Sequence, residues 1–216
     1  MTLNELASQF GTDKRENMHD YARFYDQHFS HLKDESFNLL EIGVSTGRSL
    51  LMWEKYFKKA TIYGIDNDLK WIRSDKDRIK VLFGDQLDFK FLDQLIKDVN
   101  EFTIIIDDGG HLMEQQIATF EHMFPLLSNK GIYVIEDLQT SYIQGYNKKY
   151  KDLTTIEFLK NRIEDIELNG KRVNNAHLSG RFKIDILKKD SVSMNYYEEH
   201  IDGICFYNDI CFILKR

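Results

Sequence analysis

Short apolar runs alternate with longer segments of mixed polarity between Phe37 and Glu136. Runs such as Ile104–Ile106 and Ile132–Ile135 are apolar at every position, which is typical of strands covered on both faces of a parallel sheet. Strand, helix and strand at this spacing predict right-handed crossover units. The expected strands are Asn38–Gly43, Thr61–Asp66, Lys80–Phe83, Thr103–Asp107 and Gly131–Glu136, and the expected helices are Arg48–Phe57, Ile72–Asp77, Phe89–Val99 and Met113–Leu127.

The two ends of the chain follow other patterns. Residues 1–36 have helical spacing, broken at Gly11–Lys14, and carry an aromatic stripe that we expect mainly to pack against the sheet. From Asp202 onward, two apolar segments flank Tyr207–Asp209, where Asn and Asp favour a tight turn. We therefore predict an α/β fold with a mostly parallel seven-stranded sheet, a C-terminal antiparallel hairpin and an N-terminal helical extension.

The length of 216 residues fits a single domain with a substantial core. Within it, residues 1–36 would form the helical extension. The polar, Lys- and Asn-rich residues 139–179 would form a loop-and-helix insertion over the acceptor site.

Two acid doublets, each at the end of an apolar run, are the strongest chemical signal. Asp107-Asp108 closes the first run, and Glu136-Asp137 closes the second. Open α/β sheets bind ligands at the C-terminal ends of their parallel strands, so these acids should converge there. Converging carboxylates repel one another unless protons or a cation neutralise them. The doublets predict a metal site, with His111 as a candidate base.

A glycine-containing turn follows the first strand and opens the first crossover helix. Gly43 and Gly47 allow the backbone to approach a ligand closely, and the helix start offers free N–H groups. Glu41 just before the turn disfavours a phosphate and suits the amino group of an amino-acid-like ligand. Only G-x-x-x-G is present, whereas the dinucleotide fingerprint needs G-x-G-x-x-G.

Two further acids extend this nucleotide-binding pattern. Asp66 ends the second strand, where one carboxylate can accept hydrogen bonds from both hydroxyls of a ribose. Asp85 follows the third strand, within reach of an adenine amino group. The order of these acids favours S-adenosylmethionine over NAD. The competing structural interpretation is that the glycines only permit a tight turn and that the acids cap helices.

Composition excludes several classes of partner. The formal charge of −6 argues against a general nucleic-acid binder, which needs a basic face. No stretch approaches the roughly 18 apolar residues of a membrane span, and no signal peptide is evident, so we expect neither a membrane partner nor secretion. The two cysteines match no zinc pattern and fit a reducing compartment. A cytoplasmic protein is the expectation.

The combination of motifs resembles a known family. The string EIGVSTGRSLLMWEKYF, followed by IYGID, IIIDDGGH and YVIEDLQTSY, resembles the metal-dependent sugar O-methyltransferases of the macrocin and mycinamicin group. The early GTDK, with His19 and Tyr21 after it, also resembles the opening of that family. The similarity covers residues 8–142 and the final hairpin.

This resemblance implies a Rossmann-like class I methyltransferase fold that uses S-adenosylmethionine and Mg²⁺. It implies Asp108, Glu136 and Asp137 as metal ligands and His111 as the general base. Asp107 is expected to turn toward helix N–H groups and not toward the metal. The cofactor site would comprise Glu41, Gly43, Gly47, Asp66, Asp85 and Asp107.

The implied substrate is a small sugar or glycoside acceptor. Magnesium bound to its hydroxyl would lower the hydroxyl pKa, and a histidine, whose unperturbed pKa is about 6.5, could take the proton. The chain is expected to lack the added N-terminal domain of some macrolide enzymes, so a homo-oligomer is left open. Residues 139–179 have no clear match, which leaves the acceptor open.

Three alternatives stay open at this point. An enzyme of the same fold could methylate a catechol-like diol by the same metal chemistry. A non-catalytic binding subunit could keep the fold, although the intact set of Asp108, His111, Glu136 and Asp137 speaks against it. An NAD-dependent oxidoreductase is disfavoured by the missing third glycine and by Glu41.

Overall fold

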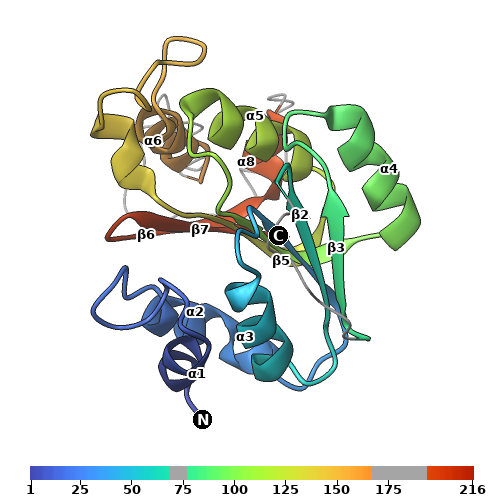
Figure 1. Ribbon diagram of the computed structural model, residues 1–216. Helices are drawn as coiled ribbons and strands as arrows, with labels where there is room; N and C mark the ends of the chain where they lie inside the picture. The colour runs from blue at the N-terminus through green and yellow to red at the C-terminus, as the bar shows by residue number, and fades with distance from the viewer. Residues whose placement is uncertain (69–76, 167–193) are drawn as a thin grey trace, which may run out of the picture.

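A seven-stranded sheet with the order β3-β2-β1-β4-β5-β7-β6 runs through the computed structural model (Figure 1). The structure describes residues 1–68, 77–166 and 194–216. The first five strands in this order, β3, β2, β1, β4 and β5, are parallel, and β7 pairs antiparallel with both β5 and β6. The strands are β1 (Asn38–Ile42), β2 (Thr61–Asp66), β3 (Ile79–Phe83), β4 (Phe102–Asp107), β5 (Leu127–Ile135), β6 (Ile201–Tyr207) and β7 (Ile210–Lys215).

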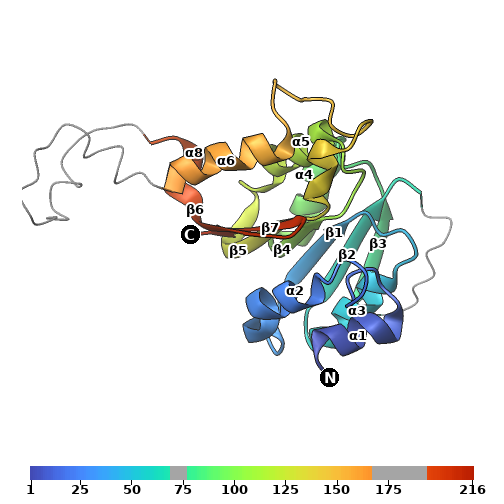
Figure 2. The same ribbon diagram turned by 90° about the vertical axis from the view of Figure 1, so that its left-hand side faces the viewer.

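Helices cover both faces of the sheet (Figures 1 and 2). Helices α1, α2 and α3 lie on one face, and α4, α5, α6 and α8 lie on the other. Each face has its own apolar core, the first around Trp53 and Phe29 and the second around Phe120 and Tyr133. The helices are α1 (Leu3–Phe10), α2 (Ala22–Phe29), η1 (Ser30–Leu32), α3 (Arg48–Tyr56), α4 (Phe89–Val99), α5 (Met113–Met123), η2 (Leu138–Tyr142), α6 (Thr155–Ile166) and α8 (Tyr196–His200).

Local sequence explains where the helices begin and end. Thr2 caps α1 and accepts a hydrogen bond from the Glu5 backbone, while Glu5 bonds back to the Thr2 N–H. Asp88 caps α4 in a similar way, through the N–H of Phe91. Gly11 ends α1 in the left-handed conformation, with φ of +70°. The GTDK segment therefore leaves the helix at once and is free to run toward the sheet edge.

The register of the parallel strands aligns their C-terminal ends. Ile42 pairs with Asp107, and Asp107 pairs with Ile135. Gly43, Asp108 and Glu136 consequently leave the sheet at the same level, each one residue beyond its strand. The alignment brings the G-x-x-x-G turn and both acid doublets to one edge.

The predicted fold class is confirmed, and the predicted strands all form. The predicted end of the helix Met113–Leu127 was wrong, because α5 stops at Met123. Pro125 has no N–H to continue the helix, and β5 already begins at Leu127. The first part of β5 had escaped prediction because Ser128, Asn129 and Lys130 are polar. The predicted helix Ile72–Asp77 lies outside the described residues, except for Asp77.

The N-terminal extension and the insertion are only partly helical. The predicted break in the helical structure of residues 1–36 covered only Gly11–Lys14, whereas the observed break runs from Gly11 to Tyr21. In the predicted insertion, η2 and α6 are helical, and residues 167–179 lie outside the described part of the chain. None of the helices in the described ranges is both long and apolar enough to cross a membrane.

Candidate active site

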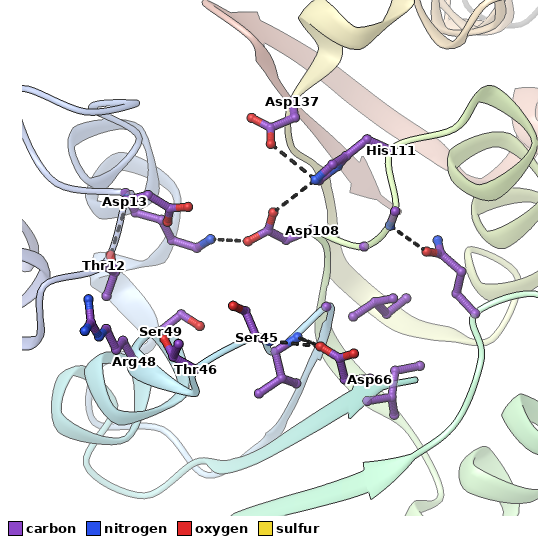
Figure 3. Close-up of a pocket in the computed structure, with 18 of the residues that line it drawn as sticks. Thr12, Asp13, Ser45, Thr46, Arg48, Ser49, Asp66, Asp108, His111 and Asp137 are labelled. Carbon is purple, nitrogen blue, oxygen red and sulfur yellow. Dashed lines mark hydrogen bonds and ion pairs between the residues drawn. The ribbon is translucent and has the colours of Figure 1, made fainter. Parts of the chain in front are cut away.

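A cavity of about 670 Å³ opens at the C-terminal edge of the parallel strands. The turns after β1, β2, β3 and β4 line it, together with the GTDK segment from the N-terminal extension (Figure 3). Asp137, just after β5, lies at one end of this cavity. Such an edge is where open α/β sheets bind their ligands.

The β1–α3 turn is packed against the β4–α5 turn without room for a side chain. Gly43 has φ of +85°, and a Cβ placed on it would overlap the carbonyl oxygen of Asp108. Asp66 fastens the same turn from β2, because its Oδ2 accepts hydrogen bonds from Val44 N at 2.8 Å and Ser45 N at 2.9 Å. Glycine is therefore required at position 43 by close approach as well as by conformation.

The predicted cofactor residues divide into two groups. Gly43, Asp66 and Asp85 line the cavity, whereas Gly47, which precedes α3, is not among the lining residues. Glu41 and Asp107 are fully buried and do not line it either. The cofactor role of these residues stays a prediction.

Asp107 faces the second core, away from the cavity. Its Oδ1 accepts hydrogen bonds from Gln86 Nε2 at 3.3 Å and Gly109 N at 3.4 Å. Burial raises the pKa of Asp107 to about 7, against the lowering effect of these hydrogen bonds. Gln86 also accepts a hydrogen bond from Gly110 N at 3.0 Å, so Asp107 and Gln86 together shape the β4–α5 turn.

Asp108, His111 and Asp137 converge at the rim of the cavity (Figure 3). One donor atom from each side chain lies within 4.8 Å of the others. His111 Nε2 is 3.3 Å from Asp137 Oδ2 and 3.9 Å from Asp108 Oδ1. Among the described residues these three form the group of His, Cys, Asp and Glu side chains that could hold a metal ion.

The oxygens of Asp108 and Asp137 that do not face His111 are held by protein donors. Lys14 Nζ donates to Asp108 Oδ2 at 2.6 Å, and Tyr21 Oη donates to Asp137 Oδ1 at 2.9 Å. Each carboxylate is thus fixed through one oxygen and directs the other toward the imidazole. This arrangement preorganises two anionic oxygens beside one nitrogen base.

Glu136 is placed differently from its neighbour Asp137. Its side chain is buried, and its oxygens contact Lys14 Nζ at 2.9 and 3.0 Å and accept a hydrogen bond from Tyr25 Oη. It is not part of the converging group. Its assignment as a metal ligand stays a prediction.

The electrostatics of the acids follow their surroundings. Burial raises the pKa of Glu136 well above its usual value, and the nearby Asp108 carboxylate adds to the effect. For Asp137, burial acts in the same direction, but His111 and the hydrogen bonds from Gln139 and Tyr21 outweigh it and lower the pKa. Asp137 is therefore the acid most firmly held as an anion.

The N-terminal extension supplies site residues that the sequence pattern did not reveal. Lys14, Tyr21 and Tyr25 all reach the acid doublets, and His19 Nδ1 lies 3.7 Å from Asp137 Oδ1. Tyr21 and Tyr25 belong to the aromatic stripe that had been interpreted mainly as packing. The available signal was GTDK itself, a charged motif with a helix-breaking glycine just before the stripe.

Known proteins similar to this chain are O-methyltransferases by name. Demethylmacrocin O-methyltransferase from Streptomyces fradiae is 31% identical over 99% of this chain and 53% of its own length. An 8-demethyl-8-alpha-L-rhamnosyl tetracenomycin-C 2'-O-methyltransferase from Streptomyces olivaceus is 35% identical over 76% of this chain and 45% of its own length. The chain spans about half the length of these curated relatives. No family model matches it.

The solved structures agree with the sequence relatives. The methyltransferase MycE from the mycinamycin biosynthetic pathway, in complex with Mg and SAH, superposes with a TM-score of 0.81 at 30% identity. The match covers 100% of this chain and 54% of that one. The Rossmann-like class I methyltransferase fold and the predicted resemblance to the macrocin and mycinamicin group are thereby confirmed.

Proposed function

We propose that the chain, with the fold and motifs of the metal-dependent sugar O-methyltransferases, methylates a sugar hydroxyl. S-adenosylmethionine would be the donor, Mg²⁺ the metal, and a glycoside or nucleotide sugar the acceptor. The observation that carries this proposal is the convergence of Asp108, His111 and Asp137 beside the cavity that Gly43 and Asp66 line.

The cavity fits the donor in chemical terms. Gly43 lines the cavity, so backbone of the β1–α3 turn would border the donor. Asp66 also lines the cavity; its Oδ1 accepts a hydrogen bond from Asp68 N at 2.8 Å and would use its second lone pair to accept one from a ribose hydroxyl. Asp85 is held by Leu87 N at 2.8 Å and would face the adenine.

The donor set at the rim fits a hard divalent cation. Asp108 and Asp137 each offer a carboxylate oxygen of the kind that Mg²⁺ prefers, and Glu136 shares the Lys14 ammonium with Asp108. We propose these three acids as the residues that hold the metal. Bound magnesium supplies a Lewis acid that lowers the pKa of an adjacent hydroxyl.

His111 would receive the proton of the acceptor hydroxyl. Its Nε2 faces Asp108 and Asp137, where an acceptor would approach, and their negative charge stabilises the imidazolium that forms. The methyl group passes from the sulfonium to the acceptor oxygen, and S-adenosylhomocysteine is left in the cavity. Methyl transfer needs the oxygen in line with the carbon–sulfur bond, so fixed positioning is the main contribution of the protein.

Two measurements test this function. Calorimetric titration with S-adenosylhomocysteine, with and without Mg²⁺, should show micromolar binding. Methyl transfer should then be assayed on glycosides, nucleotide sugars and catechols, with an EDTA control. Binding together with EDTA-sensitive transfer to a sugar supports the proposal. Exclusive transfer to catechols, full activity in EDTA, or no binding under either condition would refute it.

A further inference from the structure

Lys14 is a cation buried among acids from three different strands. Its ammonium lies 2.6 Å from Asp108, 2.9 Å from Glu136 and 3.6 Å from Glu41, and its side chain is only 1% exposed. Among the described residues, no other lysine or arginine pairs with these three carboxylates. Lys14 is therefore the point at which their charges are balanced within the protein.

The balance is incomplete. Three carboxylates share one ammonium, and neither oxygen of Glu41 accepts a hydrogen bond of ordinary geometry in the described structure, although the Ser49 side chain lies close enough to lower the pKa of Glu41. Neutral donors add to the compensation at the other acids, since Tyr25 bonds Glu136 and Tyr21 bonds Asp137. A buried carboxylate without a counter-charge is strongly destabilising, so removal of Lys14 would leave the cluster poorly compensated.

We propose that Lys14 is a resident counter-cation of the metal site. It keeps the acid cluster assembled before a divalent ion binds, and its positive charge lowers the affinity of the site for that ion. Binding is then reversible at an already folded site. This inference rests on the proposed function, because it takes the same acids to be the Mg²⁺ site.

The direction of the effect follows from Coulomb's law. A lysine ammonium and a divalent cation repel one another when both contact the same small group of carboxylates. Removal of the ammonium relieves this repulsion and leaves an extra negative charge for the metal to neutralise. Without the ammonium, the metal-free protein has a lower free energy of unfolding, and the metal-bound protein is destabilised less.

The central test is Lys14→Met, which removes the charge and keeps an unbranched side chain. Mg²⁺ affinity, measured by calorimetry, should rise at least tenfold. In EDTA the melting temperature should fall, and Mg²⁺ should raise it by more than it raises that of the unaltered protein. Equal or weaker Mg²⁺ binding by this variant, or a stability loss that Mg²⁺ does not relieve, would overturn the inference.

Lys215→Met is the matched control. Lys215 is also a buried lysine, but its ammonium bonds the backbone carbonyls of Phe124, Pro125 and Leu127 and, within the part of the chain that the structure describes, no acid. Its loss should destabilise the protein equally with and without Mg²⁺ and leave Mg²⁺ affinity unchanged. If Lys215→Met gained the same Mg²⁺ dependence as Lys14→Met, the effect would not belong to the acid cluster.

Glu41→Gln keeps the inference testable if Lys14→Met does not fold. It removes one acid from the cluster, so Mg²⁺ affinity should fall severalfold while the melting temperature in EDTA rises. The double variant, Lys14→Met with Glu41→Gln, should regain part of the stability lost by Lys14→Met. Unchanged affinity and lower stability in Glu41→Gln would contradict the inference. Absence of Mg²⁺ binding by the unaltered protein would instead refute the proposed function.

Discussion

His111 and Asp137 both adopt backbone conformations that residues other than glycine rarely take. Their φ angles are +57° and +55°. Such conformations cost of order 1–3 kcal/mol and persist where the surrounding structure holds them. In His111 the strained backbone directs Nε2 toward the two carboxylates, and its other ring nitrogen is buried without a hydrogen-bond partner in the described structure. The orientation of the ring therefore depends on Asp108 and Asp137.

We expect His111→Ala to reduce turnover at least 100-fold, the typical contribution of a general base, while S-adenosylhomocysteine binds normally. Single-turnover methyl transfer and calorimetry would measure the two effects separately. His122→Ala is the control, because His122 lies on α5 and pairs with Asp93 at 2.9 Å, away from the site. Near-normal turnover by His111→Ala would remove His111 from the mechanism.

Glu41→Gln should change how stability depends on pH in metal-free buffer. Burial raises the pKa of Glu41 from 4.5 to about 7, so the native state binds the extra proton more tightly than the unfolded chain. The protein therefore loses stability as pH rises from about 4.5 to about 7, by about 3 kcal/mol at most. Glu41→Gln should lack this loss. Its free energy of unfolding, measured in urea titrations, should therefore exceed that of the unaltered protein by a margin that grows over the same pH range. A difference in the free energy of unfolding that does not change with pH would contradict the expectation.

The position of the acids could be predicted from the sequence, and their partners could not. Asp108 and Asp137 follow the ends of apolar strands, so parallel pairing alone brings them to one edge. Lys14 lies in an irregular segment 94 residues from Asp108, and no periodicity links the two. The different surroundings of Glu136 and Asp137 were equally hidden, because they depend on which donors arrive from the N-terminal extension.

At the scale of elements, the site depends on two turns that pack directly against each other. The β1–α3 turn carries Gly43, and the β4–α5 turn carries Asp108. Their contact leaves no room for a side chain at Gly43. The two turns both line the cavity and are thus fixed to one another, so the turn with Gly43 is fixed to the turn that carries a proposed metal ligand.

Gly43→Ala should lower stability by several kcal/mol and weaken S-adenosylhomocysteine binding at least tenfold, because one turn must move away from the other. Gly47→Ala is the matched control. Gly47 also has a positive φ, of +71°, but a Cβ there would meet nothing within 4 Å. Gly47→Ala should therefore lower the free energy of unfolding by only about 1–2 kcal/mol, through backbone strain. Equal losses of binding in the two variants would show that backbone strain, and not the contact, is responsible.

Elements with strong periodicity were predicted closely, and irregular ones were not. The bounds of β2 and α4 agree with prediction at both ends. Errors arose where local polarity opposed the tertiary context, as at the start of β5, where Leu127 pairs with Phe102 of β4 and three polar residues follow within the strand. The long irregular segment before α2 had no periodic pattern to predict, because its backbone is held by local turns and its side chains reach acids far away in the sequence.

At the scale of the whole molecule, the ligand cavity joins both core layers. The GTDK segment belongs to the layer of α1, α2 and α3, while the β4–α5 turn leads into the opposite layer (Figure 2). A ligand in the cavity therefore contacts elements of both layers, and its binding should stabilise the entire fold.

We expect S-adenosylhomocysteine at about 100 times its dissociation constant to add roughly 2.7 kcal/mol to the free energy of unfolding. For a chain of this size that corresponds to a rise in melting temperature of roughly 5–10 °C. Differential scanning calorimetry would measure it, with adenosine as a weaker-binding comparison. A melting temperature unaffected by saturating ligand would show that the cavity does not bind it.

The contacts of Lys14 also determine when the site can form during folding. They join residues 94 and 122 positions apart in the chain, and closing loops of that length costs entropy before any contact offsets it. The ammonium can reach its acids only after β1, β4 and β5 have aligned, so the pocket forms late. When the denatured chain is diluted into buffer, far-ultraviolet circular dichroism should recover before the capacity to bind S-adenosylhomocysteine. A nascent chain would likewise gain its ligand site only after its sheet is in place.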